Sequence, residues 1–477
     1  MKIKSITIQN FKGIRRKAVI PLAPVTMLFG ANSSGKSSIL HALIYLFEVV
    51  VNRNPDPEYS IITGEHLYLG GFKELVFGKD INNTITLGLD LDTSDDLDVF
   101  DEFMSEVERS FVEDNTGLYP DSQTDNPSFE LDIAWNDLDN KAFVSEYRAF
   151  VYGRPFMTLR VEKGQKSVNV TLADMTHWPV ADIFQELVEE VKTGFLLPIP
   201  LHKGDTALPD PSHRLNLDFV PWSWSDIYEV HPLAAKVFAE VSLSQGLLGP
   251  LRLLQKMLAS LVHIGPLRVV PNRSFVAKRD VNRARWYDGQ AGWDSFYHGS
   301  IWLKQLVNKW YGEEHFNSNY QFFNAPLGYG VALTDTRNSH SLLPSQVGAG
   351  ISQVFPFIVA SMKTDVGIVS IEQPELHLHP AWQVELTDLM LTQTNEQSAG
   401  KQFFVETHSE HMVLRLLKRI RESQDGDQPL DNKQAQIIFC EIYEGETRLR
   451  AIGITSDGDF DTPWPNGFFE ERNKELF

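Results

Sequence analysis

The run Gly-Ala-Asn-Ser-Ser-Gly-Lys-Ser at Gly30–Ser37 restricts the possible folds of this chain more than any other stretch. It fits the pattern G-x-x-x-x-G-K-[ST], in which backbone N–H groups of a glycine-rich turn surround phosphate groups and the following helix points its positive end at them. Val25–Phe29 is apolar except for Thr26, which predicts a buried strand before the turn, and Ser37–Val50 has helical composition. The sequence therefore predicts a phosphate-binding loop in an α/β fold.

This loop supplies the predicted ligands of a nucleotide and its metal ion. We expect Lys36 to reach the β- and γ-phosphates of ATP, and Ser37 to hold Mg²⁺ through its hydroxyl. ATP and Mg²⁺ are therefore the predicted cofactors. The other candidate nucleotide ligands in the loop are Gly30, Asn32, Ser33, Ser34, Gly35 and Ser38.

A phosphate loop needs an acidic partner for the metal ion, and Glu372 is the candidate. Val366–Ile371 is an apolar segment that predicts a buried strand, and Glu372 follows it directly. A carboxylate at the end of a parallel strand next to the phosphate-loop strand can reach Mg²⁺ directly or through water. We therefore predict that Glu372 is a metal ligand on the strand beside the loop.

His408 follows another buried strand, predicted at Gln402–Glu406, in the run Glu-Thr-His-Ser-Glu-His. A histidine at the C-terminal end of a strand in an α/β sheet faces the ligand crevice, where it could sense the γ-phosphate or orient a water molecule. The alternative is a structural histidine that caps the next helix. The residues alone leave both interpretations open.

Val347–Gln353 opens a predicted helix with two glycines and a serine, Gly348, Gly350 and Ser352. Such a helix N-terminus is a second anion site. In a protein with one nucleotide per subunit, this indicates a site that serves the nucleotide of a partner subunit. The alternative is an ordinary glycine-containing turn.

The middle of the chain predicts an insertion of strands and helices. Ile6 and Ile8 near the N-terminus alternate with polar residues, whereas Ile3 falls out of phase. Further along, Ala234–Val262 predicts either one long helix or two helices broken near Gly246–Pro250. Other predicted segments are strands at Thr84–Leu91, Phe129–Trp135 and Lys166–Leu172, an acidic loop or short helix at Asp90–Glu102, a helix at Ala181–Phe195 and an exposed connection at Leu197–Pro221.

Taken in order, the four motifs resemble the ATPase head shared by the branch of the ABC superfamily that contains RecF, the SMC proteins and the OLD (overcoming lysogenization defect) nucleases. The resemblance covers both ends of the chain and not its middle. It rests on these segments: Ile8–Ile14 as the opening strand, Val347–Gln353 in place of the ABC signature, Ile371–Pro380 as Walker B and D-loop, Glu406–His411 as the histidine switch, and His263–Arg268 and Trp464–Phe469 as segments similar to those of compact bacterial ATPases of this group.

The resemblance implies an ABC-type ATPase head with a mixed sheet, interrupted by an inserted α+β lid. The implied domains are 1–80 and 263–477 as the two halves of the head, with 81–262 as the lid. Two heads would sandwich two ATP molecules, so that Lys36 and Glu372 of one subunit face Gly350 and Ser352 of the other, in a dimer or a larger homo-oligomer. Compact ATPases of this group are often encoded in anti-phage defence operons beside a separate effector, as in Septu- and PARIS-type systems, and a nuclease is one candidate for that effector.

The chain departs from this family at the catalytic position. The residue directly after the Walker B acid is usually glutamate, but here it is Gln373. A neutral amide cannot act as a general base. Four explanations stay open: hydrolysis is slow, Glu375 or His408 takes over the role, Gln373 orients water as glutamine does in some GTPases, or a glutamate was replaced to trap ATP. A second departure is that no Toprim-like nuclease segment follows the head, so OLD-type DNA cleavage in cis is not expected.

The net charge and the composition bear on which partners and which cell compartment we expect for this chain. Lys and Arg number 43 and Asp and Glu number 63, a net charge of −20, which opposes a uniformly basic nucleic-acid clamp. Nucleic acid is thus a partner that the charge does not indicate. No run of about 18 apolar residues predicts a membrane span. The N-terminus has no signal-peptide core and Cys440 is the single cysteine, so we expect a cytoplasmic protein.

Three functions compete at this point. The first is a slow ATPase whose ATP-driven dimer controls a separate effector during phage infection. The second, motivated by Gln373, is an ATP-gated scaffold that barely hydrolyses. The third is a DNA-repair ATPase of the RecF kind, against which the net charge of −20 counts. Arg268 and Arg273 could contact phosphate or adenine, but an ordinary surface position is the simpler expectation for each.

Overall fold

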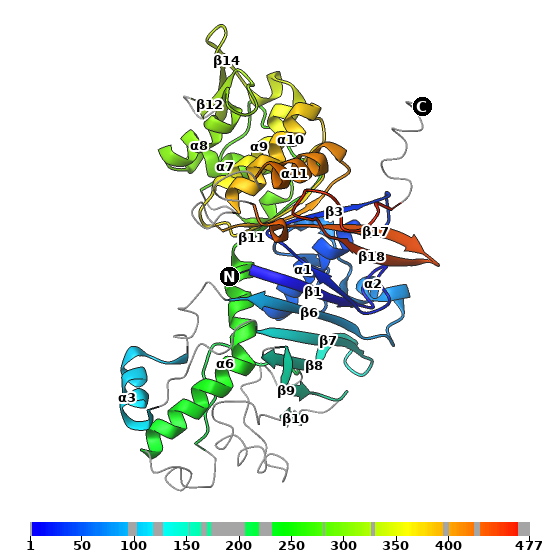
Figure 1. The fold of residues 1–477 in the computed structure, drawn as a ribbon, viewed down its shortest axis with the longest axis vertical. Helices are drawn as coiled ribbons and strands as arrows, with labels where there is room; N and C mark the ends of the chain where they lie inside the picture. Colours follow the sequence, from blue (N-terminus) through cyan, green and yellow to red (C-terminus); the bar gives the residue numbers. More distant parts are fainter. Residues whose placement is uncertain are drawn as a thin grey trace. The chain divides into compact units, whose positions relative to one another are not determined.

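The computed structural model divides into two units, each with its own main sheet (Figure 1). Unit 1 comprises Met1–Val19, Leu46–Asp56 and Gly71–Lys256, and unit 2 comprises Ile20–Tyr45, Pro57–Gly70 and Met257–Phe477. The residues that the structure describes are 2–93, 103–117, 127–151, 153–163, 169–172, 206–218, 231–279, 282–325, 330–394, 400–423 and 430–465.

Unit 1 is built on a seven-stranded sheet in the order β10-β9-β8-β7-β6-β1-β2. The five neighbouring pairs from β10 to β1 are antiparallel. Strand β1 shifts its register against β6 between Ile3 and Ser5, and this bulge lets Ile3 be buried although it is out of phase with Ile6 and Ile8. The strands are β1 (Lys2–Gln9), β2 (Ala18–Pro21), β6 (Ile85–Asp92), β7 (Ser128–Asn136), β8 (Lys141–Val151), β9 (Arg154–Arg160) and β10 (Asn169–Leu172).

Helix α6 (Pro232–Ala259) packs against this sheet. Tyr147 on β8 donates a hydrogen bond from its hydroxyl to the carbonyl of Leu247, at 2.6 Å. A Cβ atom placed on Gly246 would lie 2.4 Å from the ring of Phe156 on β9. Of the two sequence-based alternatives, one long helix is therefore correct, and Pro250 lies inside it. Position 246 requires glycine because the ring of Phe156 leaves no room for a side chain there.

An ion-pair network joins neighbouring strands of unit 1. Arg148 on β8 contacts Asp132 at 2.8 Å and Glu130 at 3.1 Å, both on β7, and Glu146 at 2.7 Å. Burial alone would lower the pKa of Arg148, but its hydrogen bonds to these carboxylates raise it. The charges on this part of the sheet are thus paired within the unit. The remaining helices of unit 1 are α2 (Gly71–Leu75), the 3-10 helix η1 (Phe77–Lys79) and α3 (Glu106–Thr116).

Unit 2 contains a six-stranded sheet in the order β11-β15-β16-β3-β17-β18. The pairs from β11 to β17 are parallel and the last pair is antiparallel. Strand β3 is buried along its whole length, as its apolar sequence predicts. The strands are β3 (Val25–Gly30), β11 (Leu261–Ile264), β15 (Ile368–Glu372), β16 (Gln402–Glu406), β17 (Ala435–Tyr443) and β18 (Glu446–Ile452).

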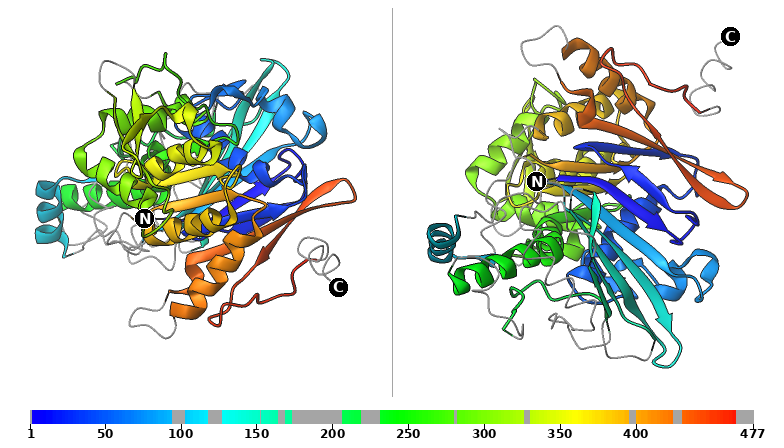
Figure 2. Two further views of the ribbon diagram at one scale, coloured as in Figure 1. Left: turned by 90° about the horizontal axis from the view of Figure 1, so that it is seen from above. Right: turned by 60° about the horizontal axis from the view of Figure 1, so that its bottom comes forward.

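Helices α9, α10 and α11 gather on one face of this sheet (Figures 1 and 2). The core beneath them includes Val25, Met27 and Phe29 of β3, together with the stacked rings of Trp293 and Phe355, whose centroids are 3.9 Å apart. The helices of unit 2 are α1 (Lys36–Val50, whose last residues belong to unit 1), α7 (Gln290–His298), α8 (Ile301–Tyr311), α9 (Ala349–Met362), α10 (Pro380–Gln393) and α11 (Glu410–Ser423).

Smaller elements complete unit 2. A three-stranded sheet runs in the order β12-β13-β14, and β4 pairs with β5 in a hairpin. Their bounds are β4 (Tyr59–Ser60), β5 (Gly64–Tyr68), β12 (Tyr320–Asn324), β13 (Val331–Asp335) and β14 (His340–Leu342), and the 3-10 helices are η3 (Arg283–Trp286), η5 (Pro344–Gln346) and η6 (Asn432–Gln434).

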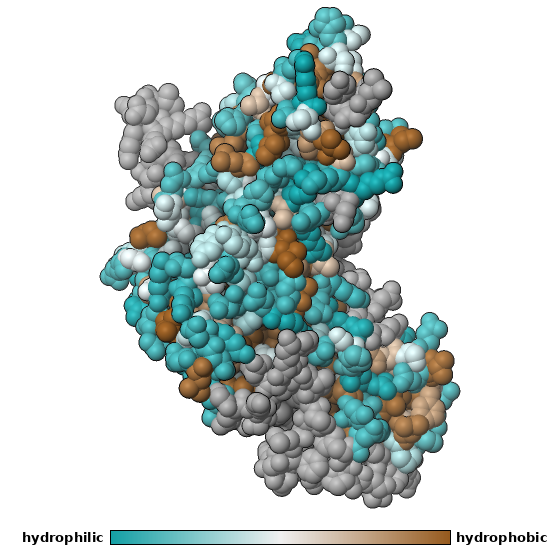
Figure 3. Space-filling view, turned by 180° about the vertical axis from the view of Figure 1, so that it is seen from behind, coloured by the Kyte–Doolittle hydropathy of each residue, from teal (hydrophilic) through white to brown (hydrophobic). Residues whose placement is uncertain are grey.

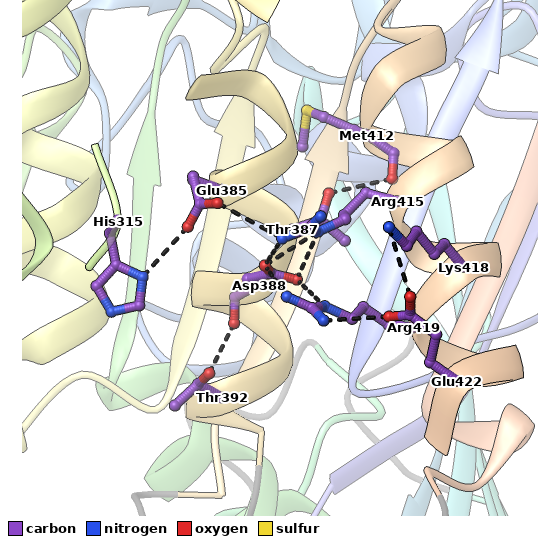
Figure 4. Close-up of polar contacts among 10 residues, drawn as sticks. All are labelled: His315, Glu385, Thr387, Asp388, Thr392, Met412, Arg415, Lys418, Arg419 and Glu422. Atoms are coloured by element: carbon purple, nitrogen blue, oxygen red, sulfur yellow. Dashed lines mark hydrogen bonds and ion pairs between the residues drawn. The ribbon is translucent and has the colours of Figure 1, made fainter. Parts of the chain in front are cut away.

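Helices α10 and α11 are joined by the ion-pair network drawn in Figure 4. Asp388 on α10 accepts hydrogen bonds from Arg415 and from both Nε and Nη2 of Arg419, the latter two at 2.8 and 2.7 Å. Glu385 extends the network to His315, at 3.2 Å. Burial alone would raise the pKa of Asp388, but the hydrogen bonds from Arg419 and Arg415 lower it. The network therefore fixes the two helices against each other.

The α/β fold class predicted from the sequence is confirmed. Strands β1 and β6–β10 form one sheet, so the sequence segment 1–80 is divided between the units, while the predicted three-domain division stays a prediction. The helix predicted at Ala181–Phe195 and residues 94–102 of the acidic segment lie outside the described residues. Residues 206–218 of the predicted exposed connection are described, and Ala207, Leu208, Leu215 and Leu217 are buried, so the prediction of an exposed segment was wrong there. Within the described chain, no helix combines the length and apolar character needed to span a bilayer. Figure 3 shows a mostly hydrophilic face with scattered hydrophobic side chains.

Candidate functional site

The glycine-rich loop connects β3 to α1, as predicted. A Cβ atom on Gly30 would lie 2.2 Å from the carbonyl oxygen of Cys440, and one on Gly35 would lie 2.6 Å from the hydroxyl of Thr447. Both glycines also have positive φ angles, 146° and 95°. The loop thus follows its path because these two positions carry no side chain. Asn32 and Ser33 are exposed on it, whereas the hydroxyl of Ser34 and the side chain of Ser38 are buried.

Lys36 lies folded back inside this loop. Its ammonium donates hydrogen bonds to the carbonyls of Gly30, at 3.1 Å, and Ala31, at 2.8 Å. It also lies 3.9 Å from a carboxylate oxygen of Glu406. Burial lowers the pKa of Lys36, while Glu406 acts in the opposite direction. A buried cation at the first turn of a helix, beside backbone N–H groups, suits phosphate oxygens.

The strand next to the loop is β16, and not the strand that ends in Glu372. Glu406, the last residue of β16, lies opposite Leu28 of β3, while β15 is one strand further along the sheet. Ser37 donates its hydroxyl hydrogen bond to Glu406 at 2.6 Å. The prediction that the strand before Glu372 neighbours the loop strand was therefore wrong, because strand order cannot be read from the local sequence. Burial raises the pKa of Glu406, and Glu372 adds to this effect.

Glu372 lies opposite Glu406 at the same edge of the sheet. His263 on β11 contacts its carboxylate at 3.2 Å and is itself held by Ser370 at 2.8 Å. His41 on α1 lies 3.9 Å from the same oxygen. Burial alone would raise the pKa of Glu372, but the two histidines outweigh it and hold this pKa well below its ordinary range. Glu372 is thus an ionised carboxylate, the form that a hard metal ion binds.

Glu375 and His408 meet at this edge as well. One oxygen of Glu375 accepts a hydrogen bond from the backbone N–H of His408 at 2.7 Å, and the other oxygen is buried with no hydrogen-bond partner among the described residues. Burial raises the pKa of Glu375. Burial also lowers the pKa of His408, with a further contribution from Lys36. The structure therefore brings together a carboxyl group whose pKa is raised and an imidazole whose pKa is lowered.

Gln373 occupies a constrained backbone position between these carboxylates. Its φ angle is 46°, in the left-handed region that residues other than glycine rarely adopt. Its backbone N–H donates to the carbonyl of Glu406 at 2.7 Å. Its carbonyl accepts a hydrogen bond from Arg268 at 3.2 Å. The backbone of the predicted catalytic position is thus held from two sides.

The signature segment lies at the first turn of α9. Gly348 is exposed and immediately precedes the helix, and a Cβ atom on Gly350 would lie 2.5 Å from the carbonyl of His377, so the glycine permits close contact with the D-loop. Ser352 is buried and donates its hydroxyl to the carbonyl of Pro344 at 2.8 Å. The role of this segment at a partner subunit's nucleotide stays a prediction.

Sequence reasoning missed several residues of this site. Glu406, His41 and His263 received no role, and Arg268 was expected at the surface but is buried. Glu406 is the last residue of a predicted buried strand, the same signal that identified Glu372, and could have been found from it. The two histidines carry no local signal, because their importance comes from the strand and helix that face Glu372.

The donor set fits Mg²⁺. The oxygens of Ser37, Glu372 and Glu406 are hard ligands at one sheet edge, and Mg²⁺ in nucleotide sites takes few protein ligands beside phosphates and water. The described part of the chain contains no group of three or more His, Cys, Asp or Glu residues arranged to hold a metal by themselves. The buried hydroxyl of Ser34 has no hydrogen-bond partner among the described residues, and a phosphate would supply an acceptor.

Comparisons with known families agree with this site. Residues 1–152 match a family model described as "AAA ATPase domain". Residues 267–413 match a model described as "AAA domain, putative AbiEii toxin, Type IV TA system". The first match contains the glycine-rich loop, and the second contains Glu372, Glu375 and His408. None of the curated proteins compared with the chain matches it.

Similar solved structures are heads of SMC proteins. The SMC head domain from Thermotoga maritima has 10% identity and a TM-score of 0.39, covering 95% of this chain and 100% of that one. The SmcHead bound to the C-winged helix domain of ScpA has 12% identity and a TM-score of 0.41, covering 95% and 98%. The Smc head with an extended coiled coil bound to the C-terminal domain of ScpA, derived from Pyrococcus furiosus, has 12% identity and a TM-score of 0.39, covering 99% and 98%.

Identities this low define no shared activity, so the assignment rests on the family models and on the loop. One model matches each end of the chain, and each match contains one half of the site described above. The two matches support an ATPase of the AAA type, whose domains bind nucleotide, usually with Mg²⁺.

Proposed function

We propose that this chain binds ATP with Mg²⁺ at Gly30–Ser37, hydrolyses it slowly, and in its ATP-bound dimer controls a separate effector protein in bacterial anti-phage defence. The observation that carries the ATPase proposal is the meeting of Lys36 and Ser37 with Glu406, at the sheet edge that also holds Glu372. These groups come from two strand ends and one helix start, so chance composition does not explain their proximity.

Different residues of the site bind the phosphates and the metal ion. Lys36 donates to phosphate oxygens in place of the carbonyls that it now contacts, and the loop N–H groups complete the cradle. Ser37, Glu372 and Glu406 would hold Mg²⁺. When bound, Mg²⁺ neutralises charge on the β- and γ-phosphates. The low pKa of Glu372 keeps it ionised over the physiological range, so the metal site does not depend on deprotonation of this group.

Hydrolysis requires a group that accepts a proton. The oxygen of a water molecule attacks the γ-phosphorus, the bond from that phosphorus to the β–γ bridging oxygen breaks, and the products are ADP and phosphate, with one proton released from the water. Gln373 cannot take this proton. We assign the role to Glu375, because one of its oxygens has no hydrogen-bond partner among the described residues and burial raises its pKa. His408 is the orienting group beside it.

The proposals of dimerisation and of effector control rest on the family resemblance, on the second family model and on the net charge. The resemblance to ABC-type heads implies that Gly348 and Gly350 serve the nucleotide of a partner subunit. The second family model is described as a putative AbiEii toxin of a type IV TA system, and this description supports a function together with a second component. A net charge of −20 favours a protein partner over nucleic acid.

The direct test is ATP turnover by the wild-type chain beside Lys36→Ala, Gln373→Glu and Glu375→Gln, with the mass in solution measured with and without ATP. We expect slow wild-type turnover, its loss in Lys36→Ala, a fall of at least ~100-fold in Glu375→Gln, and a dimer mass only with ATP. Wild-type turnover no higher than that of Lys36→Ala would reject hydrolysis. Normal turnover in Glu375→Gln would remove Glu375 from the proposed role.

The second candidate function is an ATP-gated scaffold, and the position of Gln373 favours it. Its backbone is fixed between Glu406 and Arg268, at the position where family members carry the base. If only Gln373→Glu turns over while the wild type binds ATP and dimerises, the scaffold is the correct description.

The defence role is tested in cells. Phage plaque counts on bacteria that carry the gene with its operon neighbours should fall by orders of magnitude relative to cells that carry Lys36→Ala. Deleting the neighbouring genes should restore plaques to the same extent. Protection that persists without any neighbour would exclude control of a separate effector.

A further inference from the structure

Arg268 is a buried arginine whose acceptors are all backbone carbonyls. It follows β11 in the run Gly-Pro-Leu-Arg and is only 4% exposed. Its Nε donates to the carbonyl of Gly265 at 3.0 Å. Its Nη2 donates to the carbonyls of Glu372, at 2.5 Å, and Gln373, at 3.2 Å. One side chain therefore forms hydrogen bonds with the carbonyls of the last residue of β15 and of the residue that follows it.

The backbone of Arg268 is held at the same time by helix α9. Gln353, in the first turn after the signature glycines, accepts a hydrogen bond from the N–H of Arg268 at 3.2 Å. The amide of Gln353 donates to the carbonyl of Arg268 at 2.5 Å. This reciprocal pair leaves Arg268 little freedom to move without α9. The residue thus joins the signature segment to the end of β15 through four hydrogen bonds.

Packing alone is a poor explanation for a guanidinium in this place. Burial lowers the pKa of Arg268 to about 10, with Glu375 and Glu372 acting in the opposite direction. Its Nη1 is buried with no hydrogen-bond partner among the described residues. An apolar side chain would avoid the cost of removing this cation from water. The position of the charge therefore points to a role at the site.

We propose that Arg268 is a positioning residue that sets the backbone of Glu372 and Gln373 according to the position of the signature helix α9. This inference rests on the proposed ATPase function. Gln373 holds a sparsely populated φ angle of 46°, and such a conformation persists only where its surroundings enforce it. Arg268 supplies that enforcement. A shift of α9 is thereby transmitted to the groups that hold Mg²⁺ and face the attacking water.

The first test compares Arg268→Lys and Arg268→Gln with the wild type. A lysine ammonium keeps the charge but lacks the planar fork that spans three carbonyls, so both variants should lose the grip on β15. Because misplacement of about 1 Å costs catalysis on the order of 100-fold, we expect kcat to fall ~10- to 100-fold. The Kd of a fluorescent ATP analogue should change by less than about threefold, since Lys36 and the loop are untouched.

The link through α9 is tested with Gln353→Leu. Its kcat should fall ~10-fold, and the double variant Gln353→Leu/Arg268→Gln should be no slower than Arg268→Gln alone, because the two residues act through one connection. Multiplicative losses in the double variant would show that the residues act separately and would overturn the coupling.

Arg285→Gln is the matched control. Arg285 comes from the same stretch of unit 2 and donates to Asp294, which is fully buried, at 2.8 Å, so its loss also damages a buried ion pair. It contacts neither β15 nor Gln353. We expect its melting temperature to fall at least as far as that of Arg268→Gln, with kcat unchanged. If both variants lose kcat to the same extent, and in proportion to their loss of stability, Arg268 is a structural residue and not a positioning residue.

A readout that does not need hydrolysis separates this inference from the proposed function. Amide hydrogen exchange should show that ATP protects the loop at Gly30–Ser37 in both proteins, but protects residues 349–355 only when Arg268 is present. Loop protection with equal protection of 349–355 in Arg268→Gln overturns the inference alone. Absence of loop protection in the wild type overturns the proposed function.

Discussion

The two main sheets of this protein differ in which strands pair with one another and in how their charged side chains are arranged. In unit 1, strands β6 to β10 pair with the next strand in the sequence, and the charges of Arg148 and its neighbours neutralise one another. In unit 2, β3 pairs with strands from the far end of the chain, and Glu372, Glu375 and Glu406 crowd at their ends. Parallel strands bring their carboxyl ends to one edge, so charged groups from distant segments collect there, whereas the antiparallel sheet can pair its charges between neighbouring strands.

The largest expected effect concerns the core of unit 2. Trp293 is fully buried and stacks on Phe355 with centroids 3.9 Å apart. Trp293→Ala should lower the free energy of unfolding by about 3–5 kcal/mol, measured by urea denaturation. Trp302→Ala is the control, because Trp302 lies in the same unit but is 65% exposed, and it should change stability by less than about 0.5 kcal/mol. Similar losses in the two variants would contradict the assigned core.

Glu406→Gln tests whether the carboxylates clustered at the edge of the unit 2 sheet contribute to ATP turnover. Ser37 would lose the charged acceptor of its hydroxyl, and Lys36 would lose the carboxylate 3.9 Å away. We expect ATP turnover to fall ~10- to 100-fold, as for other groups that orient metal ligands. Glu441→Gln changes an exposed carboxylate on β17 of the same sheet and should leave turnover unchanged. A fully active Glu406→Gln protein would show that strand order, and not chemistry, explains the position of Glu406.

Tyr147→Phe is the corresponding test in unit 1. It removes the buried hydrogen bond from β8 to the carbonyl of Leu247 on α6, at 2.6 Å. Stability should fall by about 1 kcal/mol, and kcat for ATP should not change, since unit 1 supplies none of the proposed ligands. Tyr68→Phe, at a side chain that is 59% exposed, should affect neither quantity. A loss of kcat in Tyr147→Phe would show that unit 1 contributes to ATP turnover, and would contradict the proposed functional difference between the two sheets.

The smallest effect depends on pH. Hydrogen bonds from Arg419 and Arg415 lower the pKa of Asp388, so this carboxylate stabilises the folded state above its unfolded pKa of about 3.9. That contribution, about 1 kcal/mol after screening by solvent, should be lost as the pH falls below 4 through the lowered pKa. Asp388→Asn should therefore be less stable than the wild type at pH 7, and this difference should shrink as the pH falls to 3, whereas Asp457→Asn should match the wild type at both. A constant difference between pH 7 and pH 3 would contradict the assignment.

The same contrast explains what could be predicted from the sequence. The loop at Gly30–Ser37 and the strand Gln402–Glu406 were located correctly, because each has a strong local pattern. The partners of β3 could not be read, because pairing between distant parallel strands leaves no local signal, and Glu406 was missed with them. Arg268 was placed at the surface because its burial depends on Gln353, 85 residues away in the chain. Local patterns thus gave the elements of the site, and tertiary contacts decided how they combine.

The position of β3 between β16 and β17 has a consequence for the synthesis of the protein. The loop strand Val25–Gly30 leaves the ribosome early, but both of its neighbours in the sheet begin only at Gln402 and Ala435. Until then the apolar strand has no partner on either side, while the consecutive strands of unit 1 can already pair. Contacts this distant form late and slowly. A growing chain therefore cannot complete the sheet around the glycine-rich loop until Ala435–Tyr443, the later of the two neighbours of β3, has been made.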